Sequence, residues 1–313
     1  MISQPTTTLP SVSVLIATYN RPADLARCLP TILANDYPDF EVVVADQSAG
    51  CATADVVAAI GDPRVRLIHC DARGKGHAVN HVVPHLTGAV LAMTDDDVTV
   101  PPDWLRQAVA VLLCEPRPAL ICGALRAIPH DRECEFVPEY VPSGFHRVRR
   151  VPLRLIDPVP DFVWSGVGAN FVSWRADFEQ LGGYDEWLGP GAPLGIADDL
   201  DLCYRALRAG FTLVHVPQVW VLHWGKRDGA HLKTLMARYG FGHGAAYTRN
   251  VLRGDWLAGL IFWQDVLWRL RKIAGALKRR ERPPHVRYTT YMFLGAVAAL
   301  RYPTSTTLPR TAE

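Results

Sequence analysis

Short apolar runs alternate with amphipathic segments along roughly the first 125 residues. The runs are rich in β-branched residues and predict four strands, at residues 11–17, 40–45, 65–68 and 89–94. Apolar positions spaced three and four apart predict helices that begin at Pro22 and lie near residues 53–60, 75–85 and 102–114. Strands that are apolar throughout and separated by helices are typical of a mostly parallel sheet covered on both faces. We therefore expect a doubly wound α/β domain, whose ligand sits at the C-terminal ends of its strands.

The pattern changes after this region. Residues 126–165 are rich in Pro and Arg and predict a loop-heavy insertion, and a strand follows at residues 168–174. The Gly- and Pro-rich residues 182–195 predict a mobile loop. Residues 198–209 predict a helix, with Gly210 in a position suited to end it.

The tail contains one strong helical pattern that begins after Asp255, a suitable N-cap. Its apolar residues recur at alternating spacings of four and three: Trp256, Leu260, Trp263, Leu267, Leu270, Ala274 and Leu277. From Lys226 onward the chain has 16 Lys and Arg against 5 Asp and Glu, whereas the preceding part has 17 basic and 26 acidic residues. Three interpretations stay open: a helix packed on the main domain, a basic helix on anionic lipid, or a dimer contact.

The composition of the 313-residue chain, 49% hydrophobic and 20% charged, is that of a globular protein and excludes a disordered or fibrous one. Seven scattered Cys residues without a C-x-x-C pair favour reduced thiols over a disulfide framework or a zinc module. Residues 1–9 lack the features of a secretory signal, and no apolar run approaches the ~18 residues of a membrane span. We expect a cytoplasmic protein, at the inner face of the membrane if the tail meets lipid.

Polar residues follow three of the predicted strands, at residues 18–21, 46–48 and 95–97. The last group, Asp95-Asp96-Asp97, places three carboxylates side by side, and these stay ionised together only beside a compensating cation. Oxygen ligands of this kind suit Mg²⁺ or Mn²⁺, which are commonly completed by substrate phosphates. The alternative is a solvated acidic turn, but the position at the end of a strand favours a ligand site.

Two further features can carry chemistry. In Asp198-Asp199-Leu200-Asp201, one carboxylate would serve as a general base, or the group would only complement the dipole of a helix N-terminus. His223 ends an apolar run, and a single histidine in such a place is more often a structural residue than a ligand.

Taken in order, several of these segments resemble those of family 2 glycosyltransferases. They are residues 14–22, 43–48, 74–80, 94–97 (the DxD-like Thr94-Asp-Asp-Asp97), 166–170, 182–186, 197–205 and 221–223. The resemblance covers about residues 11–224 and implies a GT-A fold. It divides that range into a nucleotide-binding half, 11–125, and an acceptor-side half, 126–224, and leaves 225–313 as a helical, basic C-terminal extension.

The resemblance also implies roles for single residues. The nucleobase and ribose of the donor would be bound by Thr18, Tyr19, Arg21, Asp46 and Arg73. Lys75 would approach the phosphates. Asp95 and Asp96 would lie near the ribose and diphosphate. A divalent ion, Mn²⁺ or Mg²⁺, would be held by Asp97 and His223. The acceptor side would include Trp164 and Asn170. The general base of the reaction would be Asp199 rather than Asp198. The family more often has Glu-Asp at 198–199, and Gln47 stands where Asp or Asn is commoner.

The expected activity is an inverting, metal-dependent transfer of one sugar from a nucleotide sugar, with UDP as the default carrier, to a hydroxyl group. We expect a glycan or lipid-linked acceptor in bacterial-type cell-surface glycan, polysaccharide or glycolipid assembly. The Gln-x-x-Arg-Trp motif and the membrane helices of processive synthases are missing, which favours single transfers. One alternative is a nucleotidyltransferase, which would require a Gly-rich basic loop after the first strand. The other is an inactive sugar-binding module, in which some of the carboxylates or the histidine of the proposed site would be missing. No feature indicates nucleic-acid binding.

Overall fold

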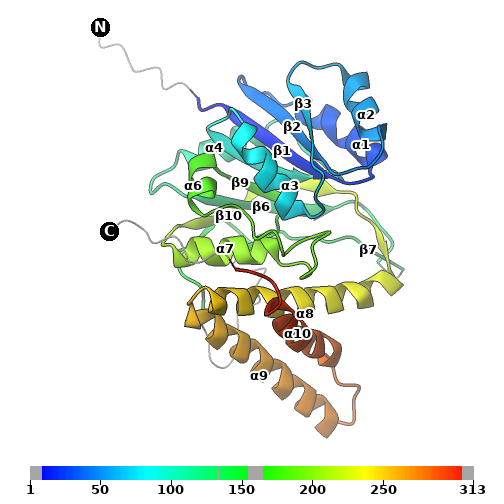
Figure 1. The fold of residues 1–313 in the computed structure, drawn as a ribbon, viewed down its shortest axis with the longest axis vertical. Coiled ribbons are helices and arrows are strands. Elements are labelled where there is room, and N and C mark those ends of the chain that lie inside the picture. Colours follow the sequence, from blue (N-terminus) through cyan, green and yellow to red (C-terminus); the bar gives the residue numbers. More distant parts are fainter. Residues whose placement is uncertain (1–8, 133, 154–164, 305–313) are drawn as a thin grey trace.

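The computed structural model describes residues 9–132, 134–153 and 165–304 (Figure 1). Within these ranges the centre of the molecule is one mixed sheet with the strand order β3-β2-β1-β4-β9-β6-β10-β5, and β8 also pairs with β10. Its strands are β1 (Val12–Thr18), β2 (Phe40–Asp46), β3 (Val65–His69), β4 (Val90–Asp95), β5 (Val98–Thr99), β6 (Leu120–Ala127), β8 (His146–Val148), β9 (Asn170–Trp174) and β10 (Leu213–His223). A separate two-stranded sheet joins β7 (Glu135–Phe136) to β11 (Arg227–Asp228).

The first half of the sheet is parallel, as the apolar runs predict. β1 pairs in parallel with both β2 and β4, and the register sets Thr18 opposite Asp46 and Ala17 opposite Asp95. The second half differs because β9 enters antiparallel between β4 and β6, while β10 runs parallel to β6. The α/β fold predicted from the sequence is confirmed, and its sheet is mixed where residues beyond 125 contribute.

Helices cover both faces of the sheet. One face packs against α1 (Pro22–Leu33) and α4 (Trp104–Leu112), and α2 (Ala52–Ile60) lies beside α1. The other face packs against α3 (Lys75–Val82), its 3₁₀ extension η1 (Val83–His85), α6 (Arg175–Gln180) and α7 (Asp198–Arg208). Alternate residues of β1 go to opposite cores, Val14 and Ile16 to the first and Leu15 to the second. Burial on both faces explains why the strands read as unbroken apolar runs.

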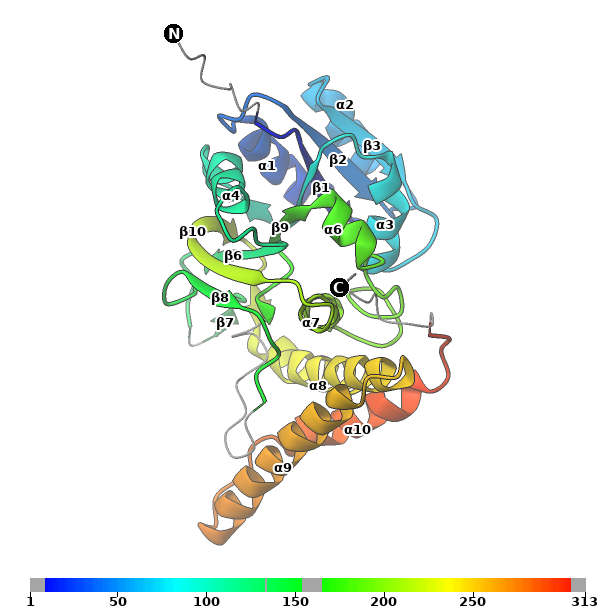
Figure 2. The same ribbon diagram turned by 90° about the vertical axis from the view of Figure 1, so that its left-hand side faces the viewer.

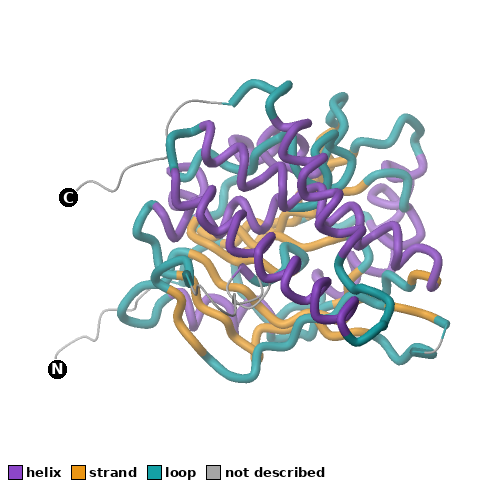
Figure 3. Tube along the Cα trace, turned by 90° about the horizontal axis from the view of Figure 1, so that it is seen from below, coloured by secondary structure: helices purple, strands orange, loops and turns teal. Residues whose placement is uncertain are grey.

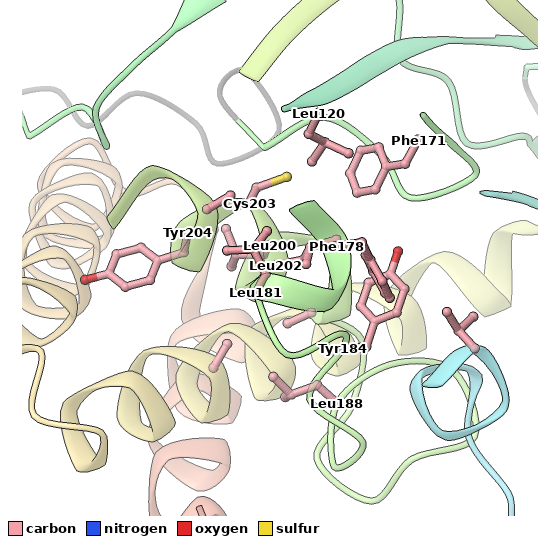
Figure 4. Close-up of a cluster of buried hydrophobic side chains, with 14 of the residues drawn as sticks. Leu120, Phe171, Phe178, Leu181, Tyr184, Leu188, Leu200, Leu202, Cys203 and Tyr204 are labelled. Atoms are coloured by element: carbon pink, nitrogen blue, oxygen red, sulfur yellow. The ribbon is translucent and has the colours of Figure 1, made fainter. Parts of the chain in front are cut away.

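The Gly- and Pro-rich residues 182–195 form part of the second core and not a free loop. Leu188 and Leu194 are completely buried, and Figure 4 shows Leu188 with Leu181 and Tyr184 beside the residues of α7. The side chain of Asp185 is buried and forms ion pairs with Arg249 and Arg253. The expectation of a mobile loop is therefore corrected: apolar burial and paired charges hold this segment in place.

The C-terminal region consists of α8 (Gly229–Leu252), α9 (Trp256–Lys278) and α10 (Val286–Ala299). α8 lies against α7, and α9 and α10 lie on the side of α8 away from the sheet (Figure 2). Seen from below, these helices cross the molecule beneath the strands (Figure 3). The predicted N-cap is confirmed, because the backbone N–H of Leu257 donates to Asp255 Oδ1 over 3.1 Å. None of the helices in the described ranges combines the length and apolar character that crossing a membrane requires.

Neither α8 nor α10 is anticipated by the periodicity of the sequence. The two helices touch through glycines: a Cβ added to Gly244 would lie 1.9 Å from the Met292 carbonyl oxygen, and one added to Gly295 would lie 1.9 Å from that of Phe241. Glycine has low intrinsic helix propensity, so the sequence signal for these helices is weak. The backbones approach closely enough for packing between the helices to supply the stabilisation instead.

Candidate active site

A cavity of about 360 Å³ lies at the C-terminal ends of β1 and β4. It is lined by strand ends, by the tip of the 182–195 segment, by the first turn of α7 and by residues after β10. Most of the candidate residues line it together: Thr18, Tyr19, Arg21, Arg73, Lys75, Asp95, Asp96, Asp97, Asp198, Asp199 and His223. Segments more than 200 residues apart in sequence thus meet in one place, as expected for the strand ends of an open α/β sheet.

The strand register explains how His223 reaches the carboxylates. β10 pairs antiparallel with the short β5, and this pairing sets His223 opposite Val98, the residue next to Asp97. The same strand end lies opposite Ala127 of β6. The histidine is therefore placed at the acidic cluster by backbone pairing on both sides.

Asp96 is the most enclosed of the three consecutive carboxylates. The Thr18 hydroxyl donates to its Oδ2 over 2.7 Å, and Arg21 Nη1 lies 3.1 Å from its Oδ1. Burial raises the pKa of Asp96 to about 6, although the Thr18 hydrogen bond and the Arg21 charge act in the opposite direction. Arg21 Nη1 also lies 3.1 Å from Asp97 Oδ2, so a single half-exposed guanidinium serves two carboxylates.

Asp97 and His223 form a pair whose chemistry fits a divalent cation. His223 Nδ1 lies 3.0 Å from the Pro138 carbonyl oxygen, which accepts only, so Nδ1 carries a proton. This leaves Nε2 facing Asp97 Oδ1 at 3.4 Å, and two lone pairs in that position need a proton or a metal ion between them. Gly225 lies over the pair: a Cβ there would come within 2.7 Å of His223 Nε2 and 2.8 Å of Asp97 Oδ2.

Electrostatics of the pair agree with this fit. Burial alone would raise the pKa of Asp97 and lower that of His223, but their mutual interaction outweighs burial and moves both pKa values the other way. Without a metal, these shifts favour a protonated His223 beside an ionised Asp97. Within the described residues no group of three or more His, Cys, Asp or Glu side chains is arranged to hold an ion.

Lys75 joins the strand-end carboxylates to α7. Its Nζ lies 2.5 Å from Asp95 Oδ1. Burial would lower the pKa of Lys75, but the charges of Asp95 and Asp198 outweigh it and raise the pKa above its usual range. Burial together with the charge of Asp199 raises the pKa of Asp198 to about 7, and Lys75 opposes this shift. Asp198 is only 3% exposed and lies against Gly189, where a Cβ would come within 2.9 Å of its Cγ.

Asp199 differs from its neighbour in exposure and in partners. It is partly exposed to the cavity, and the backbone N–H of Gly168 donates to its Oδ2 over 3.0 Å. The N–H of Leu200 lies 3.0 Å from its Oδ1. Each oxygen therefore keeps a free lone pair, and the side chain is held in a fixed direction at the cavity wall.

Tyr19 and Arg73 form the opposite end of the cavity. The guanidinium carbon of Arg73 lies 3.5 Å from the centre of the Tyr19 ring, a close cation–π contact. Gln47 also lines the cavity, and its side-chain amide donates to the carbonyl groups of Ala72 and Gly74. An aromatic ring and a planar cation together give a flat surface suited to stacking a nucleobase.

Two of the candidate residues that the structure describes, Asp46 and Asn170, do not line the cavity. Asp46 is buried behind it and accepts a hydrogen bond from the Ser48 N–H over 2.9 Å. Asn170, assigned to the acceptor side from the sequence, is completely buried: its amide donates to the carbonyls of Ala124 and Val219 and its oxygen accepts from Trp104 Nε1. It therefore ties together β6, β10 and α4, and the assignment is corrected because every strong contact it makes is internal. Trp164 lies outside the described residues.

Sequence reasoning missed the part of the cavity wall that comes after His223. Arg227, Leu235, Arg238 and Tyr239 line the cavity, the last three from α8. Arg227 Nε is buried and has no hydrogen-bond partner in the described part of the chain. The basic residues between His223 and the tail helix were the available signal, but treating 225–313 as a separate extension hid it.

Comparison with known proteins agrees with this geometry. Residues 13–164 match the sequence profile of the family described as Glycosyl transferase family 2. The succinoglycan biosynthesis protein ExoO of Rhizobium meliloti is 41% identical over 102 residues, 32% of this chain and 29% of that protein. The pre-mycofactocin glycosyltransferase of Mycobacterium tuberculosis is 26% identical over 272 residues, 86% of this chain and 54% of that protein. The chain thus spans about half the length, or less, of these curated relatives.

Solved structures show the same fold. The mannosyltransferase PcManGT from Pyrobaculum calidifontis, in complex with GDP-Man and Mn²⁺, aligns with a TM-score of 0.60 and 21% identity, covering 94% of this chain and 88% of that one. TarS of S. aureus in complex with UDP-GlcNAc aligns with a TM-score of 0.52 and 15% identity, covering 74% of this chain and 66% of that one. The fold is that of the GT-A glycosyltransferases. Within that class, residues 13–164 carry the sequence profile of glycosyltransferase family 2.

Proposed function

We propose that this protein transfers a single sugar from a nucleotide sugar to an acceptor hydroxyl group, with the help of a divalent metal ion and with inversion at the anomeric carbon. One observation carries the proposal: Asp95–Asp97, His223 and the Asp198–Asp199 pair surround a single cavity at the ends of β1 and β4. That cavity combines a flat base-binding end, a cationic wall and a carboxylate directed into open space, which are the groups that such a transfer needs.

The donor would lie along the cavity from Tyr19 to Asp97. Its base would stack near Tyr19 and Arg73, and the ribose would meet the Thr18–Asp96 edge. Lys75, Arg227 and Arg238 would face the diphosphate, and Arg227 would gain the partner that its buried Nε lacks. Asp46 stays behind this surface, so its role would be to fix the 46–48 turn.

Asp97 and His223 would hold the divalent ion. Bound there, the ion would neutralise the negative charge that develops on the departing diphosphate. Arg21 lies on the same two carboxylates, Asp96 and Asp97, and would move its charge toward the phosphates when the ion is present. PcManGT, which shares the fold, binds Mn²⁺ together with GDP-Man, and this supports a metal in the present cavity.

Asp199 would act as the general base. An acceptor oxygen attacks the anomeric carbon from the face opposite the diphosphate, the bond from that carbon to the phosphate oxygen breaks, and the acceptor proton passes to Asp199. The base must reach a hydroxyl group in the open cavity, and Asp199 is the partly exposed member of the pair. Asp198 is packed against Gly189 and lies near Lys75. It would therefore position Lys75 and adjust the charge around Asp199.

The donor and acceptor classes follow by analogy with the relatives. UDP-GlcNAc and GDP-Man occur with two proteins of this fold, so UDP-sugars are the first donors to test and GDP-sugars the second. ExoO is named for succinoglycan biosynthesis, which supports a role in assembling a cell-surface glycan, polysaccharide or glycolipid.

A two-stage experiment tests this function. Calorimetric titration with UDP, GDP and dTDP, each with and without Mn²⁺, would identify the carrier nucleotide. Release of that nucleoside diphosphate from its sugars would then be measured with a panel of soluble and lipid-linked glycan acceptors. We expect metal-dependent binding of one nucleotide and acceptor-dependent release. A folded protein that binds no nucleotide under any of these conditions would contradict the proposal.

A further inference from the structure

The outer surface of α9 and α10 exposes large apolar side chains. Along α9 the alternating stripe predicted from the sequence points away from the rest of the molecule: Trp256 is 76% exposed, Leu260 60% and Trp263 55%. The stripe continues through exposed Leu267 and Leu270, and α10 adds Phe293, Leu294 and Val297. The helix packs on the molecule with a different side, through residues such as Ala258, Ile261 and Val266. We call the exposed surface the α9–α10 face.

The side chains of the α9–α10 face are contiguous across the two helices. The rings of Trp263 and Phe293 are 6.1 Å apart, and Trp268 lies 5.2 Å from His285 near the start of α10, so the helices run antiparallel with their apolar residues side by side. Where α9 begins, an apolar groove opens beside α8, lined by Val251, Trp256, Leu260 and others. A continuous exposed apolar surface of this kind marks an interaction site.

Positive charge gathers at one end of the α9–α10 face, where α9 ends and α10 begins. Its acidic residues are neutralised locally, because Asp265 pairs with Arg269 over 3.1 Å and Glu281 with Arg279 over 2.9 Å. Several cations remain, and within the described ranges none of them has a carboxylate at ion-pair distance: Arg271, Lys272, Lys278, Arg280, Arg282 and Arg287. The partner of this face should therefore be both apolar and anionic.

We propose that the α9–α10 face binds the surface of an anionic lipid bilayer. Tryptophan and leucine on one side of a helix, with Lys and Arg beside them, match the apolar boundary and the anionic headgroups of such a surface. Charge also argues against a second copy as the occupant, because two such faces would bring like charges together. A helix lying in the interface needs no membrane-crossing length.

The arrangement links lipid contact to the cavity. α8 carries Arg238 and Tyr239 in the cavity wall, and its last turns are fixed to the core by buried ion pairs of Arg249 and Arg253. The α9–α10 face and the cavity are thus connected through α8. Resting on the proposed function, this geometry favours an acceptor hydroxyl that is carried by a lipid and presented at the same surface.

Vesicle co-sedimentation tests the proposal without any nucleotide sugar, so its outcome is independent of the transfer reaction. The full chain is mixed with vesicles of phosphatidylcholine alone or mixed with phosphatidylglycerol. Leu260→Glu with Leu267→Glu alters the face, and Leu113→Glu is the matched control because Leu113, at 46%, is about as exposed as Leu267, at 50%. Thermal melting verifies that each variant is folded.

We expect the wild type and Leu113→Glu to bind the anionic vesicles at least tenfold more strongly than the neutral ones. The affinity of the double variant for the anionic vesicles should be at least tenfold lower than that of the wild type. Arg271→Gln or Lys278→Gln should each lower this affinity about fivefold at low salt. Equal binding by the double variant and the wild type, or no binding by either, would overturn the proposal. So would a dimer in light scattering without lipid that the double variant abolishes, because the face would then belong to a second copy.

Discussion

Asp201 lies about one helical turn after Asp198 and Asp199 on α7 and differs from them in its charge partners. Asp201 is completely buried. Its carboxylate accepts hydrogen bonds from Arg205 over 2.7 Å, from Arg253 over 2.9 Å and from the Asn250 amide over 2.8 Å. Burial would raise its pKa, but Arg205 and Arg253 outweigh burial and lower the pKa to about 2. Asp198 and Asp199, by contrast, share the single cation Lys75 with Asp95.

The difference separates structural charge from functional charge. Around Asp201 each charge is matched, and the network with Asp185, Arg249 and Arg253 fastens α8 to α7 and to the 182–195 segment. At the acidic end of the cavity the cations are shared, because Arg21 contacts both Asp96 and Asp97 and Lys75 faces both Asp95 and Asp198. Burial is therefore not fully compensated, and the pKa values of Asp96 and Asp198 rise. A set of groups that stays unbalanced in the folded chain is suited to be completed by a ligand.

The largest effect is expected from removing the proposed base. Asp199→Asn keeps the hydrogen bond from the Gly168 N–H but cannot accept a proton, so turnover should fall by about 10²–10⁴-fold while donor binding is retained. Initial rates of nucleoside diphosphate release and calorimetric donor binding measure the two quantities. Asp198→Asn is the matched comparison, and a greater loss of turnover in that variant would exchange the two roles.

A substitution in the balanced network should affect stability instead. Asp201→Asn leaves Arg205 without a counter-charge in a buried place and removes one of the two carboxylates that Arg253 contacts, so it should reduce the free energy of unfolding by about 3–5 kcal/mol. Urea denaturation measures this change. Arg27→Met, which breaks the exposed pair with Asp24, is the control and should cost less than about 1 kcal/mol. Equal effects of the two substitutions would show that the network is not structural.

The cationic wall of the cavity predicts a smaller and selective effect. Arg227→Gln should weaken nucleoside diphosphate binding by about 10–100-fold, the value of a charge-assisted hydrogen bond, and leave the binding of the bare nucleoside nearly unchanged. Calorimetric titration with both ligands makes the comparison. Arg106→Gln, at an exposed pair with Asp36, should change neither. Similar losses for nucleoside and diphosphate would place Arg227 away from the phosphates.

The smallest effect is a pH dependence of stability at Asp198. Burial and Asp199 raise its pKa, against Lys75, so its neutral form is favoured in the folded state. Wild-type stability should therefore decline as pH rises from about 4, the unfolded pKa, to about 7. Without metal or nucleotide, Asp198→Asn should raise the melting temperature at pH 8 by about 2 °C for each kcal/mol of relieved penalty, and should have no effect near pH 4. A uniform shift at both pH values would contradict this linkage.

The sequence predicted those parts of the fold and site that depend on local pattern. The four parallel strands are short runs of mostly apolar residues, and the carboxylates at the end of β4 follow from chain order and strand direction. α8 and α10 could not be predicted in this way, because their glycines lower local helix propensity and they depend on contact with each other. Asn170 was misassigned for the opposite reason: its motif position was correct, but only the fold shows that its amide is fully used.

The apolar residues that recur along α9 show what periodicity does and does not predict. Their periodicity correctly identified α9, yet the apolar side of the helix faces outward and a different side packs on the molecule. Periodicity alone cannot tell which apolar partner a stripe will meet. Arg249 of α8 and Arg253, just after that helix, complete the buried network, and Arg227 lies in the cavity wall. The sequence did not reveal these roles, because all three residues come after the segment that carries the family resemblance.

The most direct test of the central claim, that the unbalanced cavity is completed by a metal and a nucleotide, is a thermal shift experiment with Mn²⁺ and nucleoside diphosphates. The wild type, Asp97→Ala and the control Asp36→Ala at an exposed carboxylate would be compared. At a ligand concentration 100-fold above Kd, the wild type and the control should gain about 2.7 kcal/mol with one nucleotide, only when Mn²⁺ is present, and Asp97→Ala should lose this gain. A folded wild type that shows no shift with any nucleotide, or an Asp97→Ala variant that responds like the wild type, would contradict the claim.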